Sequence, residues 1–283
     1  MNTPCRLVRA RRAPGGAAVA ILIACAVLGL SSGAGAFTIA VTGVYDENVT
    51  QANTVNFSRT SDGVNERSLA TFSQMVTNAF NAGLGGVINF DLPGSQPSVA
   101  ANGGTFEATF GVGRTLTITN ASNSPMSIGG PGTDRTAISG DRYLVKGGTV
   151  TDANGVGPQG NFVFDFNPDD KVWAVGFTLL GREQSGTPNF ATPQITLSDG
   201  TVVGLPAGQF RGVPGNGVLD SFWGFELSPQ QKADGLSITR INTNPAANLF
   251  TGLDDLAFIV APEPGRAMLA GLGLLLLTLR RRR

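Results

Sequence analysis

Residues 171–180 read KVWAVGFTLL, and this stretch carries the clearest fold signal in the chain. Its large apolar side chains occupy alternate positions: Trp173, Val175, Phe177 and Leu179. Because side chains two residues apart lie on one face of a strand, these four share a face. Gly176 lies on the other face, where another side chain or the backbone of a neighbour can approach closely. The stretch therefore predicts a strand with one large apolar face.

The rest of the chain between residues 37 and 260 shows the same kind of pattern. Turn residues recur roughly every eight to twelve positions, which is typical of an all-β domain. Strands are predicted at residues 87–92, 114–119, 161–166, 172–180, 194–197, 201–204, 221–227, 236–241 and 253–260. Ser198, Asp199 and Gly200 form a hairpin signal between two of them. The chain is therefore predicted to be all-β, with an antiparallel β-sandwich and one or two short helices.

One helix is predicted within this pattern. Residues 66–81 place apolar side chains three and four positions apart: Leu69, Phe72, Val76 and Phe80. This spacing indicates an amphipathic helix, which Asp62 or Asn65 could cap and Gly83 could end. The Gly-rich residues 129–133 predict a loop, which could divide the body into halves at 37–130 and 131–260.

The first 36 residues have the features of a secretory signal peptide. Four arginines precede an apolar run at residues 17–30: Arg6, Arg9, Arg11 and Arg12. Ala34 and Ala36 supply the small side chains that cleavage requires, so we expect the mature chain to begin at Phe37. Residues 22–25, LIAC, resemble a lipobox, which would instead make Cys25 a lipidated N-terminus. The apolar run continues past Cys25, which favours the first interpretation.

The mature chain lacks the residues of several kinds of catalytic and metal site. The chain has no histidine, and both cysteines, Cys5 and Cys25, precede residue 37. This excludes disulfides, Ser-His-Asp triads, cysteine nucleophiles and zinc sites of the ordinary ligand type. The body, residues 37–260, holds 11 Lys and Arg against 19 Asp and Glu, a net charge of −8. This charge argues against nucleic acid as a partner.

The last 23 residues, 261–283, combine three elements in order. Pro262, Glu263 and Pro264 form an extended tripeptide, because proline disfavours both helix and central strand. An apolar run of 13 residues follows at 267–279, about 20 Å as a helix and so short for a hydrocarbon core of about 30 Å. Flanking arginines can offset this mismatch. Four of them close the chain and are expected to stay cytoplasmic: Arg280, Arg281, Arg282 and Arg283.

This tail resembles the PEP-CTERM sorting signal of Gram-negative bacteria, although Ala261 stands where many members carry Val. The resemblance implies recognition by an exosortase, a membrane enzyme similar to cysteine transpeptidases, which cuts at or near the Pro-Glu-Pro motif. It also implies passage through the inner membrane, transient anchoring there, and a final place at the cell surface or outside the cell. The family is associated with exopolysaccharide and biofilm. A sorting signal does not identify the activity of the body.

From Phe162 onward, the body resembles the jelly-roll ectodomains that commonly precede this signal. The resemblance rests on residues 172–178, 222–225 and 252–258, which read VWAVGFT, FWGF and GLDDLAF. Such domains look like lectin sandwiches, so a glycan partner is implied. The expectation is a non-enzymatic surface or matrix protein. An exported carbohydrate-active enzyme, or a glycan-binding module with the same signal, is the alternative.

Two oxygen-rich groups could hold a metal ion. Asp254 and Asp255 in the last strand could supply a carboxylate to a structural Ca²⁺ ion, the one cofactor considered. On a strand they point to opposite faces, and the sequence favours one carboxylate capping a turn and the other in solvent. The second group lies near Pro168, between two predicted strands: Asp165, Asn167, Asp169 and Asp170. It lacks the spacing of an EF-hand and favours a solvated turn.

The aromatic and glutamate residues leave similar alternatives. Trp173 and Trp223 could stack on sugar rings, but both lie in apolar strands, which favours core packing. Glu107, Glu183 and Glu226 could join aspartates in a glycosidase pair, which needs carboxylates about 5 to 9.5 Å apart. No local motif supports such a pair, so no catalytic residue is predicted.

Overall fold

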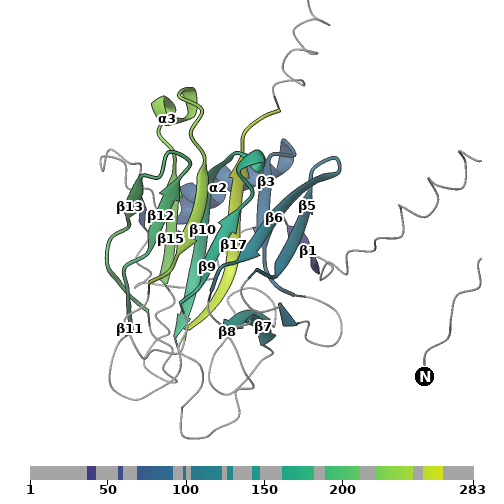
Figure 1. Ribbon diagram of the computed structural model, residues 1–283. Coiled ribbons are helices and arrows are strands. Elements are labelled where there is room, and N and C mark those ends of the chain that lie inside the picture. The colour runs from purple at the N-terminus through teal and green to yellow at the C-terminus, as the bar shows by residue number, and fades with distance from the viewer. Residues whose placement is uncertain are drawn as a thin grey trace, which may run out of the picture. The chain divides into compact units, whose positions relative to one another are not determined.

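The computed structural model describes residues 37–42, 57–59, 69–91, 98–99, 103–122, 126–129, 142–146, 161–181, 189–210, 221–244 and 251–263. The chain divides into two compact units, Met1–Gly35 and Ala36–Arg283, and the described residues all belong to the second. This unit is mostly β-strand (Figure 1). The predicted all-β class is confirmed.

The described elements are β1 (Phe37–Thr42), β2 (Phe57–Arg59), α2 (Leu69–Asn81), β3 (Gly85–Ile88), β4 (Ser98–Val99), β5 (Thr105–Phe110), β6 (Arg114–Asn120), β7 (Met126–Gly129), β8 (Tyr143–Lys146), β9 (Val163–Phe166), η1 (Pro168–Asp170), β10 (Val172–Gly181), β11 (Asn189–Ala191), β12 (Gln194–Leu197), β13 (Val202–Gly204), β14 (Gly208–Phe210), β15 (Ser221–Glu226), α3 (Pro229–Ala233), β16 (Ile238–Asn242) and β17 (Thr251–Val260). Each of the nine strands predicted from the sequence is present, with bounds that agree to within a few residues. The strand expected at 87–92 runs from Gly85 to Ile88. It cannot continue to residue 92 as a regular strand, because Phe90 adopts a φ of 60° that interrupts extended backbone.

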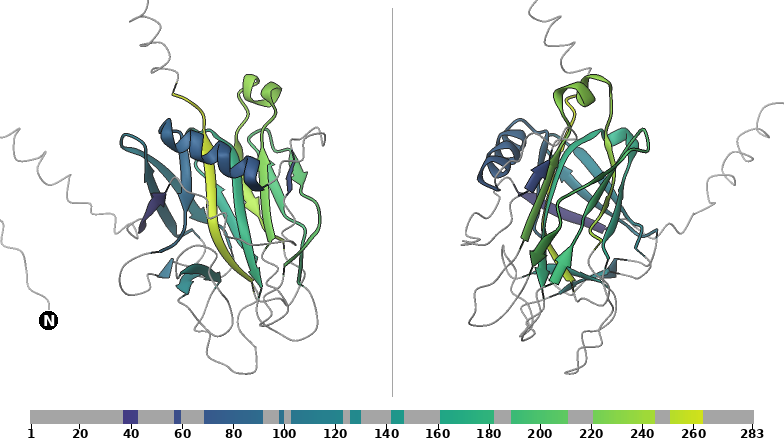
Figure 2. Two further views of the ribbon diagram at one scale, coloured as in Figure 1. Left: turned by 180° about the vertical axis from the view of Figure 1, so that it is seen from behind. Right: turned by 90° about the vertical axis from the view of Figure 1, so that its left-hand side faces the viewer.

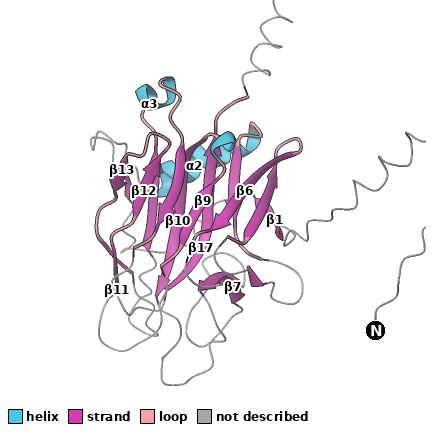
Figure 3. Cartoon of the chain, in the orientation of Figure 1, coloured by secondary structure: helices cyan, strands magenta, loops and turns pink. Residues whose placement is uncertain are grey.

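The described strands form one 15-stranded sheet and a separate pair, β11 and β14. Within the large sheet the order β10-β16-β9-β6-β5-β1-β3-β17 returns to β10, because β17 also pairs with β10. The sheet therefore nearly closes on itself (Figure 3). β17 lies beside β3 and β10, so strands from both sides of residue 130 share one sheet.

Two pairings depart from the expected antiparallel arrangement. β1 runs parallel to β5, and β2 runs parallel to β15. The sequence pattern reports which face of a strand is apolar but carries no information on strand direction, so these pairings could not be read from it. The remaining ladders are antiparallel, among them β10 with β15 and with β17.

Alternate residues of the sheet are buried together in one apolar core. This core contains Val175, Phe177 and Leu179, with Trp173 partly buried against it, as residues 171–180 predict. A second apolar cluster lies between α2 and the opposite face of the sheet: Phe72, Val76, Val87, Ala174, Phe222 and Ala257. Figure 2 shows α2 lying across that face. The helix ends at Asn81, and the predicted Gly83 follows it with a φ of 69° and donates its N–H to the Phe80 carbonyl at 2.9 Å.

Two glycines create the recess that receives the helix. Gly176 of β10 lies opposite Gly224 of β15, and Phe72 covers both. A Cβ atom added at Gly176 would lie 2.6 Å from Cε1 of Phe72, and one added at Gly224 would lie 2.9 Å from Cδ2 of the same ring. The close approach predicted at Gly176 is confirmed, and the approaching group is an aromatic ring.

The predicted hairpin at residues 198–200 joins β12 to β13. The Thr201 N–H donates to Oδ1 of Asp199 at 2.9 Å, and this hydrogen bond lowers the pKa of the Asp199 carboxyl. Gly200 has a φ of 86°, a conformation that L-residues adopt only with strain.

Gly200→Ala is expected to lower the free energy of unfolding by about 1–2 kcal/mol, the cost of left-handed backbone for an L-residue. Gly204→Ala is the matched control, because Gly204 has no positive φ and an added Cβ there would meet nothing within 4 Å. The control is expected to leave stability unchanged or raise it by up to about 1 kcal/mol. Urea denaturation measures both, and equal losses for the two variants would contradict the role of the turn.

Candidate functional site

The last strand, β17, ends between two other segments of the chain, to which it is hydrogen-bonded. The Val260 N–H donates to the Leu84 carbonyl at 2.8 Å, and the Ala261 N–H donates to the Lys171 carbonyl at 2.9 Å. Pro262 has no N–H to continue the ladder, and both it and Glu263 are exposed. The first two residues of the tripeptide therefore lie at the surface directly beyond β17.

Arg114, at the start of β6, contacts this segment with two of its nitrogens. Nε lies 3.2 Å from Oε1 of Glu263, and Nη2 donates to the Ala261 carbonyl at 3.2 Å. The guanidinium also lies over the Phe110 ring, 5.3 Å from its centroid. The Arg114 side chain is 13% exposed and that of Glu263 is 47% exposed, so the arginine is the more firmly held partner.

A polar cavity of about 260 Å³ lies beside this contact. Arg114, Glu263 and the 3-10 residues Asp169 and Asp170 line it. Asp170 is half-buried, and its Oδ2 accepts the Thr117 N–H at 3.1 Å. Burial raises the pKa of the Asp170 carboxyl, and neighbouring Asp169 adds to this rise, while the Thr117 hydrogen bond and Arg114 oppose it.

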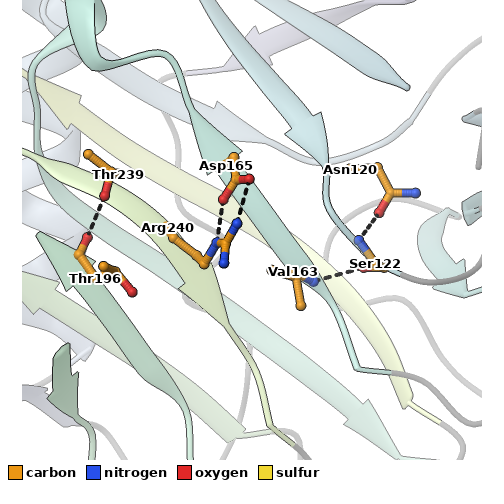
Figure 4. A network of polar contacts seen from close by, with 7 residues as sticks. All are labelled: Asn120, Ser122, Val163, Asp165, Thr196, Thr239 and Arg240. Carbon is orange, nitrogen blue, oxygen red and sulfur yellow. Dashed lines mark hydrogen bonds and ion pairs between the residues drawn. The ribbon is translucent and has the colours of Figure 1, made fainter. Parts of the chain in front are cut away.

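The oxygen-rich group predicted around residue 168 does not converge on one point. Asp165 accepts two hydrogen bonds from Arg240: Nε donates to Oδ1 at 2.5 Å and Nη2 donates to Oδ2 at 2.8 Å (Figure 4). This pairing raises the pKa of the Arg240 guanidinium. Asn167 caps η1 by accepting the Asp169 N–H at 3.1 Å. The expected turn is confirmed, and Asp165 belongs to a cross-strand ion pair.

The same face of the sheet carries further hydrogen bonds that join neighbouring strands. The Thr239 hydroxyl donates to the Thr196 carbonyl at 3.2 Å, and the Val163 N–H donates to Oγ of Ser122 at 2.8 Å (Figure 4). These contacts link β16 to β12, and β9 to the residues just after β6. They hold strands in register and do not converge on a common point.

Asp254 and Asp255 are both buried, at 0% and 1% exposure. The expectation that one of them faces solvent is therefore wrong. Asp255 has a φ of 49°, and the ladder between β17 and β10 shifts register between Gly176 and Thr178. This bulge breaks the alternation on which the expectation relied. The Asp255 N–H donates to Oδ1 of Asp254 at 2.9 Å.

The two tryptophans have different environments. Trp223 is completely buried, stacks on Phe177 with centroids 6.2 Å apart, and donates Nε1–H to the Pro206 carbonyl at 3.1 Å. Core packing is thus confirmed for Trp223. Trp173 is partly buried, and Nζ of Lys232 lies 5.4 Å from its ring centroid.

Two of the three glutamates named for glycoside hydrolysis lie in described strands, next to residues other than aspartate. Glu226 lies 2.6 Å from Nζ of Lys232, and Glu107 lies opposite Thr117 in the β5–β6 ladder. Glu183 lies outside the described residues. Across the parts of the chain that the structure describes, no three Asp, Glu, His or Cys side chains are grouped so as to hold a metal ion.

Several sequence-predicted site residues lie outside the described residues: Ala34, Ala36, Cys25, Pro264, Arg280, Arg281, Arg282 and Arg283. Phe37 begins β1. None of the described helices is both long and apolar enough to cross a membrane. Sequence reasoning missed Arg114, since 147 residues separate it from Ala261 and no local motif marks it.

Comparisons of the chain with protein-family models, with curated proteins and with solved structures found no match. Function therefore has to be argued from the residues themselves.

Proposed function

We propose that this chain is an exported, non-enzymatic surface or matrix protein of a Gram-negative bacterium, sorted by an exosortase-like enzyme. The observation that carries the proposal is the order Pro262-Glu263-Pro264, apolar run, arginine cluster. The exposed position of Pro262 and Glu263 at the end of β17 supports it, because a processing enzyme must reach the motif. Removal of residues 1–36 and cutting near Glu263 would leave the all-β body at the cell surface or in the medium.

The body is proposed to be a jelly-roll-like sandwich that associates with exopolysaccharide. Its near-closed sheet and its acidic, cysteine-free composition are compatible with an extracellular module that binds neutral glycans. The inner membrane and the sorting enzyme are its partners before processing, and nucleic acid is not proposed as a partner.

Incubation of the processed protein with exopolysaccharide is expected to sediment the two together without releasing reducing sugar ends. This outcome follows from binding without turnover. Release of reducing ends that is lost on changing an acidic pair would instead support the alternative, an exported carbohydrate-active enzyme. If the protein neither binds nor hydrolyses the polysaccharide, both assignments are contradicted, and a purely structural role in the matrix is left.

A structural Ca²⁺ ion at Asp254 or Asp255 is the second proposal for the body. The burial of both carboxylates favours it, because buried ionised carboxylates must be balanced by hydrogen bonds, a charged partner or a cation.

If calcium fills this role, EDTA is expected to lower the melting temperature of the processed protein, and added Ca²⁺ to restore it. Asp254→Asn should abolish the response, whereas Asp234→Asn, at an exposed residue that follows α3, should keep it. A melting temperature that EDTA leaves unchanged would assign both buried aspartates to hydrogen bonding within the sheet.

A further inference from the structure

We propose that Arg114 is a latch, which holds residues 261–263 on the body and must open before the sorting enzyme can cut the chain. Arg114 acts on Ala261 and Glu263, and the Lys171 carbonyl accepts a further hydrogen bond from the Ala261 N–H. This proposal rests on the proposed function. It adds that Arg114, 147 positions before Ala261, controls access to the motif.

The main-chain polar groups around the tripeptide are largely bonded to the body already. Proteins commonly bind extended peptides through main-chain hydrogen bonds as well as through side-chain contacts. Pro262 and Pro264 have no N–H, so the main-chain donors from Ala261 to Pro264 are those of Ala261 and Glu263. The Ala261 N–H is already bonded to Lys171, and its carbonyl is bonded to Arg114.

The Glu263 side chain is engaged as well. Its Oε1 lies 3.2 Å from Nε of Arg114, so the only charged group of the tripeptide is paired with the body. The Arg114 guanidinium also lies over the Phe110 ring, 5.3 Å from its centroid. An enzyme that reads Glu263 and the adjoining backbone in extended form must therefore displace these contacts.

The segment that Arg114 holds lies close to the apolar run, so holding it shortens the length of chain that can reach an enzyme at the membrane. Three residues, 264–266, separate Glu263 from the apolar run that begins at Ala267. Fully extended, three residues span at most about 10 Å. Release of residues 261–263 from the body doubles the number of residues available to enter an active site at the membrane surface.

The latch is weak enough to open during processing. An ion pair with one partner half-exposed, like Glu263 at 47%, is solvent-screened. The loss of such a pair changes an equilibrium by roughly two- to five-fold. Arg114 therefore tunes the rate at which the motif becomes available, and the enzyme supplies the remaining binding energy.

The test is a pulse–chase measurement of processing in cells that contain the sorting enzyme, with the full chain and two substitutions. Arg114→Gln is expected to be processed about two- to five-fold faster than the wild type. Arg240→Gln removes the ion pair with Asp165 and is the matched control, expected to be processed at the wild-type rate. Processing of Arg114→Gln at the wild-type rate or more slowly would overturn the latch.

A second measurement is independent of the enzyme. In the detergent-solubilised full chain, Arg114→Gln should speed hydrogen exchange at the Ala261 amide, which donates to the Lys171 carbonyl. Arg114→Lys should have a smaller effect, because lysine keeps the positive charge beside Glu263 although it lacks the planar fork of arginine. Unchanged exchange would overturn the latch. If the wild-type chain is not processed at all, the proposed function and the role of the latch in it both fail, while faster exchange would still show that Arg114 restrains this segment.

Discussion

Phe72→Ala is expected to lower the free energy of unfolding by about 3–5 kcal/mol, the usual cost of removing a buried phenylalanine ring. Phe72 is completely buried, and its ring lies 5.3 Å from that of Phe222, centroid to centroid. It also covers the paired glycines Gly176 and Gly224, which have no side chains to fill the space it would vacate. The resulting cavity would lie between α2 and two central strands, where relaxation is limited.

Phe80→Ala on the same helix is the matched control. Phe80 is 36% exposed, so its truncation should cost less than about 1 kcal/mol. Urea denaturation followed by circular dichroism measures both variants. Comparable losses would show that α2 is not held by the Phe72 contact, and the packing described for this face of the sheet would be wrong.

Replacement of Pro262, Glu263 and Pro264 by alanine is expected to abolish release nearly completely and to keep the precursor in the inner membrane. The apolar run at 267–279 is flanked by Arg266 and by the final arginines, which favour its retention at the membrane unless the chain is cut. Alanine removes both the extended backbone of the tripeptide and its single charge.

Cell fractionation with an antibody against the body measures this outcome. Val202→Ala, at a side chain 57% exposed on β13, is the control and should be released normally. Normal release of the triple-alanine variant would contradict the sorting proposal and would leave the latch without a role.

Local sequence patterns were sufficient where a structural feature depends on neighbours along the chain. The alternation in residues 171–180 identified the buried face, and Gly176 identified the point of close approach. The hairpin at Gly200 and the helix end at Gly83 follow from the same local chemistry. β5 was missed although Thr105–Phe110 alternates buried with more exposed residues, so a signal was present there.

Features that depend on distant segments could not be predicted. The parallel pairing of β1 with β5 is a matter of topology, which no local window contains. Asp254 and Asp255 were expected on opposite faces, but the bulge at Asp255 is created by the register of β17 against β10. The contact of Arg114 with Glu263 likewise arises because the start of β6 lies close to the residues that follow β17.

The most direct test of the account is the intact mass of the protein recovered from the culture supernatant and from the cell surface. The expected mass is that of a chain that lacks residues 1–36, begins at Phe37 and ends near Glu263, without the arginine cluster. A mass that extends through Arg283 would contradict it, because the protein would then be a membrane-anchored precursor that no sorting enzyme has cut.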